Sequence, residues 1–411
     1  MQRPLIVAFA LSICASACGS LAPAPIAGSA TNVRAVCAGA PAGAFSCLAL
    51  IRNDVGGAVS TGYHGEDLTQ AFPAAPHCNK TPPYCASDLQ DAYGITQASA
   101  VGTGIVAIVD AFGYPNAEAD LAVYRSAMLL PACTIGSGCL RIVNESGASS
   151  PLPSPNPFWG AEQAIDMDMV SAICPNCKII LVQATAADNP SFSAAENAAV
   201  SLGADAVSNS YDAAEKSADN PAFNHPGHVI TASAGDGGAG MTQPCSFTNV
   251  VCVGGTSLTP SSGARGWSEV TWGTGLEDGT GSGCSTMVQK PVWQTDKGCT
   301  MRSETDISAV ADPNTGVAIY YPLSGGWVES GGTSVASPII AAMFALAGNS
   351  ATISAPQFIW AHGGTNAYHD IISGSNPGVF RCPAIMLYIC QAGPGYDGPT
   401  GWGTPNGISG F

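Results

Sequence analysis

The sequence predicts an α/β fold in which a mostly parallel central sheet carries helices on both faces. Two observations support this prediction. Short, continuously apolar runs, typical of strands buried on both faces, alternate along the chain with stretches of helical length. The 411 residues, of which 46% are hydrophobic, also provide enough apolar material for a large core.

This alternation begins near residue 83 and continues toward the C-terminus. The first strand is expected at residues 104–110, where the sequence reads Gly-Ile-Val-Ala-Ile-Val-Asp. Further strands are expected at 178–183, 205–211, 228–234 and 250–254, and helices at 117–129, 158–173, 194–202 and 334–347. Residues 83–411 are therefore predicted to form one folded domain.

The N-terminal residues resemble an export signal. Arg3 precedes an apolar run at residues 5–13, and small residues follow it. This order, and a run too short to span a bilayer, predict a signal peptide over residues 1–18. Cys18 leaves a lipid anchor open as an alternative. Residues 19–82, rich in Ala, Gly and Pro, are expected to be a short pro-region or linker.

The cysteines agree with export. Two of the 16 lie in or beside the leader, and an even number remains, which in an exported chain indicates disulfides. Pairing of near neighbours is the simplest proposal: 37/47, 78/85, 133/139, 174/177, 245/252, 284/299 and 382/390. Cys174 and Cys177 could instead be a redox or metal pair, but no second Cys-Xaa-Xaa-Cys accompanies them, which favours a structural bridge.

The charge balance excludes some partners. Acidic residues number 29 against 13 basic ones, for a net charge of -16. Nucleic acids and anionic membranes require Lys and Arg, so we expect neither as a partner, and no transmembrane segment is expected. The acidity fits either simple solubility or work at low pH, where few salt bridges exist to be broken by protonation.

A strong chemical signal lies at residues 330–338, Ser-Gly-Gly-Thr-Ser-Val-Ala-Ser-Pro. Ser334 follows a glycine-rich turn and opens a helix, where free backbone N–H groups and the helix dipole favour a developing oxyanion. Taken alone, Ser334 could be an N-cap. The whole motif resembles the nucleophile segment of the subtilisin-like superfamily.

A nucleophilic serine needs a base, and none of the six histidines lies in the His-Gly-Thr segment that subtilisins use. The helix at 158–173 offers carboxylates instead. Glu162 and Asp166 lie about 40° apart on its apolar face, whereas Asp168 points elsewhere. Two buried acids four residues apart persist most easily by sharing a proton. A solvated acidic face would have polar neighbours, which this stripe lacks.

These residues make the chain similar to the sedolisin family, the serine-carboxyl peptidases, over roughly residues 83–411. The resemblance implies a subtilisin-like fold and a secreted endopeptidase that works at acidic pH. It implies that Glu162 is the base for Ser334, that Asp166 supports Glu162, and that a protonated Asp236 donates to the oxyanion. Asp236 lies in Ser233-Ala-Gly-Asp, where alanine is inserted into the family's Ser-Gly-Asp segment.

The resemblance also implies one structural calcium ion. Residues 369–371 and 392–397 are similar to the family's calcium loop. Oxygen ligands and flexible glycines suit Ca²⁺. The implied ligands are two carboxylates and three backbone carbonyls: Asp370, Ile371, Gly393, Gly395 and Asp397.

Some features depart from the family, and two other functions stay open. The pro-region is short, which puts autoprocessing in doubt, and Asp110 is interpreted as structural because no matching histidine follows it. A conventional subtilisin-like hydrolase and a non-catalytic exported binding protein are the alternatives. We expect a monomer that acts on protein or peptide substrates, secreted or held in the periplasm or at the cell surface.

Overall fold

The computed structural model describes residues 33–37, 44–52, 75–96, 102–273, 278–376, 382 and 384–411. Within residues 33–411 these form one compact unit. The predicted signal peptide and Cys18 lie outside the described residues.

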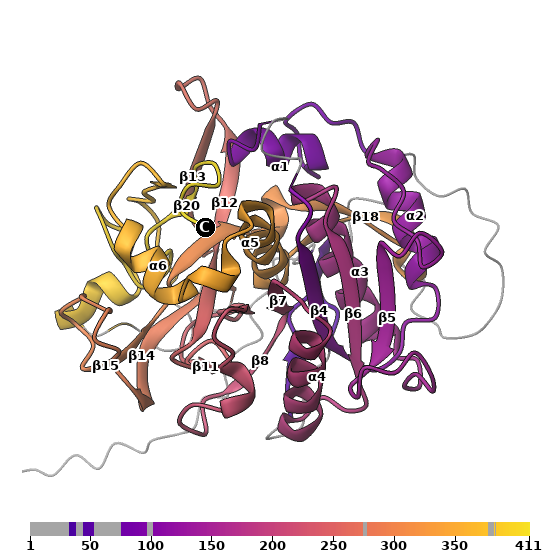
Figure 1. Cartoon of the computed structure of the whole chain (residues 1–411). Coiled ribbons are helices and arrows are strands. Elements are labelled where there is room, and N and C mark those ends of the chain that lie inside the picture. Colours follow the sequence, from indigo (N-terminus) through magenta and orange to yellow (C-terminus); the bar gives the residue numbers. More distant parts are fainter. Residues whose placement is uncertain are drawn as a thin grey trace, which may run out of the picture. The chain divides into compact units, whose positions relative to one another are not determined.

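The centre of the fold is an eight-stranded sheet (Figure 1). Its strands follow the order β13 (Trp267–Thr271), β12 (Val250–Pro260), β9 (Val229–Ser233), β7 (Ala206–Asn209), β4 (Ile105–Ala111), β6 (Lys178–Ala184) and β5 (Leu140–Asn144), and β16 (Ile307–Val310) also pairs with β12. All pairs are parallel except β12 with β13. The predicted α/β class with a mostly parallel sheet is confirmed.

Helices cover both faces of this sheet because its strands alternate between two cores. On β4, Val106 and Ile108 pack into one apolar cluster and Ala107 and Val109 into another. The first cluster holds residues of α1 (Ala86–Ala92), α2 (Ala117–Ala127), α3 (Pro157–Ile173), α5 (Thr333–Ala347) and α6 (Ala355–His362), and the second holds those of α4 (Asn189–Ser201).

Helix α3 is buried on all sides, not along one stripe. Every residue from Trp159 to Ile173 is buried, and the helix packs against α5. Its start is fixed by Asn156, whose side chain accepts the N–H groups of the first turn, and by Pro157 in that turn. Asp168 is buried too, on another side, where it accepts the Tyr320 N–H at 3.0 Å.

Smaller sheets surround the central one. Their strands are β1 (Val33–Ala35), β3 (Leu50–Arg52), β18 (Gly326–Gly331) and β17 (Val317–Tyr321) in one sheet, β11 (Thr242–Gln243), β8 (Tyr211–Ala214) and β2 (Ser46–Cys47) in another, β10 (Gly237–Ala239), β14 (Gly279–Gln289) and β15 (Met301–Glu304) in a third, and β19 (Tyr368–His369) with β20 (Thr404–Pro405). Strands β1, β2 and β3 come from the segment that the sequence predicted to be a pro-region or linker.

Some predicted boundaries were wrong. The helix expected at 194–202 begins earlier, at Asn189, because Asp188 caps it by accepting the Ser191 N–H at 2.9 Å. The strand expected at 250–254 continues to Pro260. Its first part pairs with β9 and its last part pairs with β13. The strand expected at 205–211 divides into β7 and β8 around Ser210.

All seven local disulfides are present: Cys37–Cys47, Cys78–Cys85, Cys133–Cys139, Cys174–Cys177, Cys245–Cys252, Cys284–Cys299 and Cys382–Cys390. The pairing of near neighbours is therefore confirmed, and Cys174 with Cys177 forms a bridge. In the described part of the chain, no helix combines the length and the apolar character that a membrane crossing needs.

Candidate active site

The candidate site lies where three neighbouring parallel strands end. Asp110 lies at the end of β4, Ser210 directly follows β7, and Asp236 follows β9. The order β9-β7-β4 puts these three carboxyl ends side by side. Such edges of open α/β sheets are where ligands commonly bind.

Ser334 is the second residue of α5, and the chain around it is shaped for close approach. Gly332, the N-cap, has a φ of 97°, which favours glycine. A Cβ there would overlap the Leu48 carbonyl oxygen and lie 2.8 Å from Asp236 Oδ2. Pro338 lacks an N–H and so leaves the Ser334 carbonyl free, and the Ser210 hydroxyl lies 3.4 Å from that carbonyl.

Glu162 reaches this serine from α3. The Ser334 hydroxyl is 3.4 Å from the Ser210 carbonyl and also interacts with the Glu162 carboxylate. The Leu48 N–H donates to Glu162 Oε2 at 2.9 Å. Burial, followed by the charge of Asp166, raises the pKa of Glu162 well above its usual range, although both hydrogen bonds oppose this.

Behind Glu162, Asp166 and Asp110 form a buried carboxyl pair. Asp166 Oδ1 accepts the Ser210 hydroxyl at 2.7 Å. Among the described residues, no donor contacts Asp166 Oδ2 or either oxygen of Asp110. Burial raises the pKa of both carboxyls well above the usual range, and the charge of Asp166 raises that of Asp110 further. A proton held between them makes the hydrogen bond that two ionised acids cannot.

The sequence analysis thus did not predict that Asp110 lies at the site, next to Asp166. The expectation was a structural role, because no histidine follows it in a conventional pattern. The available signal was its position at the end of a central buried strand, but sequence alone did not say that α3 would bring Asp166 to it.

Asp236 contacts Thr333, the residue before Ser334. Its Oδ1 accepts both the Thr333 N–H and the Thr333 hydroxyl at 2.8 Å. Its Oδ2 is buried and has no donor among the described residues. Burial raises the pKa of Asp236 to about 8, against the two hydrogen bonds from Thr333. Below that pH the side chain is a neutral acid that can donate from Oδ2.

No histidine is among the hydrogen-bond partners of Ser334, Glu162 or Asp166 in the described part of the chain. His228 lies 2.7 Å from the Ala204 carbonyl, and His362 lies 2.9 Å from the Phe358 carbonyl one turn earlier in α6.

The residues of the expected calcium loop also come together. Asp397 is buried and accepts the N–H groups of Gly393 and Thr400 at 3.0 and 2.9 Å, and Asp370 accepts the Gly395 N–H at 2.9 Å. Burial raises the pKa of Asp397 to about 7, and the nearby Asp370 charge adds to this rise. Two carboxylates that repel each other across glycine-rich backbone fit a hard cation such as Ca²⁺.

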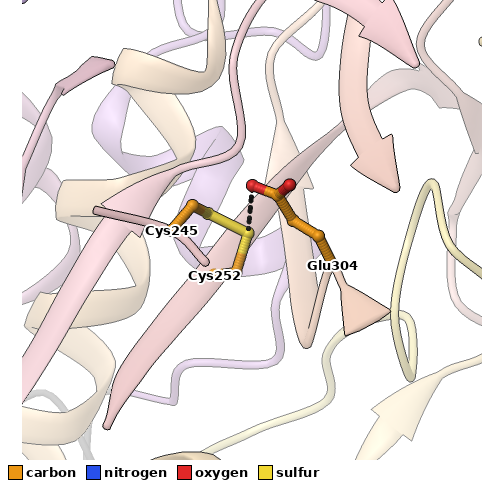
Figure 2. A group of neighbouring side chains, drawn as sticks. All are labelled: Cys245, Cys252 and Glu304. Carbon is orange, nitrogen blue, oxygen red and sulfur yellow. Dashed lines mark hydrogen bonds between the residues drawn. A yellow bond between two sulfur atoms is a disulfide. The ribbon is translucent and has the colours of Figure 1, made fainter. Parts of the chain in front are cut away.

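A third group, at β12 and β15, joins Cys245, Cys252 and Glu304 (Figure 2). Figure 2 shows that the two sulfurs form a disulfide, with Glu304 Oε1 3.3 Å from the Cys252 sulfur. A bridged sulfur is not a thiolate, and metals bind thiolates. This group is therefore a buried disulfide beside a carboxyl group.

No protein-family model matches the sequence. Three curated relatives do. Sedolisin from Pseudomonas sp. is 36% identical over 176 residues, which are 40% of this chain and 28% of that protein. Kumamolisin from Bacillus sp. is 28% identical over 361 residues (79% and 62%). Xanthomonalisin from Xanthomonas sp. is 30% identical over 209 residues (45% and 24%). The chain thus spans less than two thirds of each relative's length.

A solved structure shares the fold. The chain resembles a Pseudomonas sedolisin, described as a serine-carboxyl proteinase complexed with two molecules of pseudo-iodotyrostatin, with a TM-score of 0.65 and 24% identity over 80% of this chain and 96% of that one. The fold class is therefore the subtilisin-like one that the sequence predicted. The chain is thus similar to three sedolisin-type peptidases in sequence and to a sedolisin in fold.

The buried carboxyl groups predict that stability falls as pH rises. Burial raises the pKa of Glu196 and Asp236 to about 8 and that of Asp212 to about 7. The folded state thus holds protons that the unfolded chain releases above about pH 4, so this stabilisation is complete in acid and is lost as pH rises toward 8. A fully buried group such as Glu196 contributes a loss of about 1.4 kcal/mol per pH unit, and the partly exposed Asp212 and Asp236 contribute less.

Urea unfolding at pH 4, 6 and 8 measures this slope. Glu196→Gln, which removes one titrating group far from Ser334 in sequence, should flatten it. An equal slope in the variant, or greater stability at pH 8 than at pH 4, would contradict the assignment.

Proposed function

We propose that the protein is a secreted serine-carboxyl endopeptidase that cleaves peptide bonds at acidic pH through an acyl-enzyme on Ser334. The supporting observation is that Glu162 and Asp166 on α3, Asp236 after β9 and Ser334 on α5 come from three separate segments and lie together at one edge of the sheet. The seven disulfides suit an oxidising compartment outside the cytosol. Protein or peptide substrates follow from this chemistry, and the expected monomer remains part of the proposal.

In the proposed reaction the Ser334 oxygen bonds to the substrate carbonyl carbon while Glu162 accepts the hydroxyl proton. Glu162 then gives that proton to the amine that leaves, and the carbon–nitrogen bond breaks. Water then attacks the acyl carbon while Glu162 accepts its proton, the bond from that carbon to the Ser334 oxygen breaks, and Glu162 returns the proton to Ser334. The Ser210 hydroxyl donates to Asp166, and Asp166 shares a proton with Asp110. By taking up or releasing that proton, Asp166 changes the charge that acts on Glu162.

Asp236 acts in its neutral form. The tetrahedral oxyanion needs donors that are already in place, and the first N–H groups of α5 together with Asp236 Oδ2 can provide them. An ionised Asp236 would repel the oxyanion. Because the pKa of Asp236 is about 8, the donor is fully protonated in acid and is lost as the pH rises through that value.

The first test is proteolysis of casein across pH 3–9 by wild type, Ser334→Ala and Glu162→Gln. We expect activity in the acidic range, and a loss of at least about 10³-fold in kcat for each variant, since nucleophile and base act as one unit. An active Ser334→Ala variant would reject the proposal. Wild-type activity confined to pH 7–9 would favour a conventional subtilisin-like mechanism, and inactivity at every pH a binding protein.

Asp236 variants test the oxyanion donor. Asp236→Ala should lose about 10²–10³-fold in kcat, because one donor is removed. Asp236→Asn keeps a donor that never ionises, so it should retain more activity than Asp236→Ala and lose the decline in kcat near pH 8. The pH dependence of kcat for a peptide substrate decides this. The same alkaline decline in Asp236→Asn and wild type would place the titrating group elsewhere.

We further propose that one Ca²⁺ is bound by the carboxylates of Asp370 and Asp397 with the backbone carbonyls of Ile371, Gly393 and Gly395. Among the described residues, no hydrogen bond to these three carbonyls is formed, which leaves them available. The ion would neutralise the buried Asp397 carboxylate and join two C-terminal loops.

Calcium should therefore raise the melting temperature of wild-type protein and leave that of Asp397→Asn almost unchanged, because ligands stabilise the state that binds them. Differential scanning calorimetry with excess EDTA, Ca²⁺ or Mg²⁺ makes the comparison. The proposed calcium site would be contradicted if Ca²⁺ stabilised both proteins equally or stabilised neither of them.

A further inference from the structure

Residues 45–52 form an extended segment, called the strap below, that crosses the candidate active site. Its first half pairs antiparallel with β8, through Ser46 opposite Asp212 and Cys47 opposite Tyr211. Its second half pairs antiparallel with β18, through Leu50 opposite Gly331. Both partners adjoin the site in sequence, since β8 follows Ser210 and β18 ends three residues before Ser334. The strap thus adds a strand to two open edges, as a bound peptide does.

The middle of the strap lies on the candidate catalytic residues. The Leu48 N–H donates to Glu162 Oε2 at 2.9 Å. The Leu48 carbonyl oxygen lies against the Cα of Gly332, where Asp236 Oδ2 also approaches. A peptide unit of the chain's own therefore occupies the space where the proposed chemistry takes place.

The start of the strap is anchored by Phe45 in a set of aromatic rings. Phe45 is only 3% exposed and meets Phe192 and Tyr211 edge-on, at centroid distances of 5.2 and 5.3 Å. Trp159 lies 6.0 Å from Phe192 and 6.3 Å from Tyr211. The Phe45 N–H donates to the Ala187 carbonyl at 3.1 Å. The side chain and the backbone of Phe45 thus both contact residues outside the strap.

We propose that Trp159, Phe192 and Tyr211, called the aromatic box, form a specificity subsite. It binds an aromatic substrate side chain three residues before the residue whose carbonyl Ser334 attacks. Leu48 marks that residue in the strap, and Phe45 marks the side chain in the box. This inference rests on the proposed peptidase function. The strap occupies the same strand edges as the substrate, so it must leave them before a substrate binds.

The box belongs to the fold and not to the strap, which is why a substrate can use it. Trp159 lies on α3, Phe192 on α4 and Tyr211 on β8. Phe192 and Tyr211 are stacked at 3.8 Å, which fixes two of the walls. Edge-to-face contacts of this kind favour an aromatic ring over an aliphatic side chain of similar area.

The experiment compares two fluorogenic peptides with the cores Phe-Ser-Ser-Leu-Ala-Leu and Ala-Ser-Ser-Leu-Ala-Leu, the strap sequence with serine in place of Cys47 and its alanine counterpart. Wild-type enzyme should cleave both after the first leucine, with kcat/KM about ten- to hundredfold higher for the Phe peptide, as expected for burial of one ring. Mass spectrometry of the products locates the cut.

Two variants test whether the aromatic box causes the preference for the Phe peptide. Phe192→Leu, milder than an alanine substitution, should reduce the ratio between the peptides to less than about threefold. Phe223→Leu is the matched control, because Phe223 is equally buried in the same apolar cluster but packs on Phe247, 5.4 Å away. The control should keep the wild-type ratio. Melting temperatures show whether both variants fold.

Equal cleavage of the two peptides by wild type would overturn the subsite and leave the proposed function standing. If wild type cleaves neither peptide nor casein, the proposed function fails, and the subsite is then decided by binding alone. Calorimetric titration of each peptide into Ser334→Ala combined with Phe45→Ala, which empties the box, should give tighter binding of the Phe peptide, and equal or undetectable binding of both would overturn the inference.

Discussion

The structure depends on keeping carboxyl groups inside the protein next to a serine. Asp110, Glu162 and Asp166 are all fully buried, and three of the four oxygens of Asp110 and Asp166 have no donor among the described residues. Ionised acids in such surroundings are too costly, so the group has to retain protons. Burial of α3 on every side and the strand order β9-β7-β4 both impose this condition. The same constraint links folding to chemistry, because burial of Glu162 and Asp236 raises the pKa of two groups that the proposed reaction uses.

Burial raises the pKa of Asp236 as well, next to the start of α5. Its Oδ1 is held by Thr333, so its other oxygen is free to carry a proton toward the N-terminus of α5. A base and an oxyanion donor made from the same functional group need different protonation states in the proposed reaction. The strap fits this arrangement, since its neutral peptide unit donates to Glu162 without adding charge.

Much of this could be predicted from local sequence. Continuous apolar runs located β4, β6, β7, β9 and β12, and the pairing of near-neighbour cysteines followed from spacing, because short loops restrict the choice of partner. The helical period put Glu162 and Asp166 together on α3. What local patterns could not show was tertiary: that Asp110 meets Asp166, and that weakly patterned residues 45–52 cross the candidate active site. Strands such as β2 and β3 are only two or three residues long and gain their structure from the edges they join.

The central claim is that a carboxylate, and not a histidine, activates Ser334. Labelling with a fluorophosphonate probe at acidic pH, followed by peptide mapping, tests it most directly because it reports the nucleophile without a substrate. We predict that wild type is labelled on Ser334 and that Glu162→Gln, still folded, is labelled at least about 100-fold more slowly. Equal labelling of Ser334 in the two proteins would contradict the account.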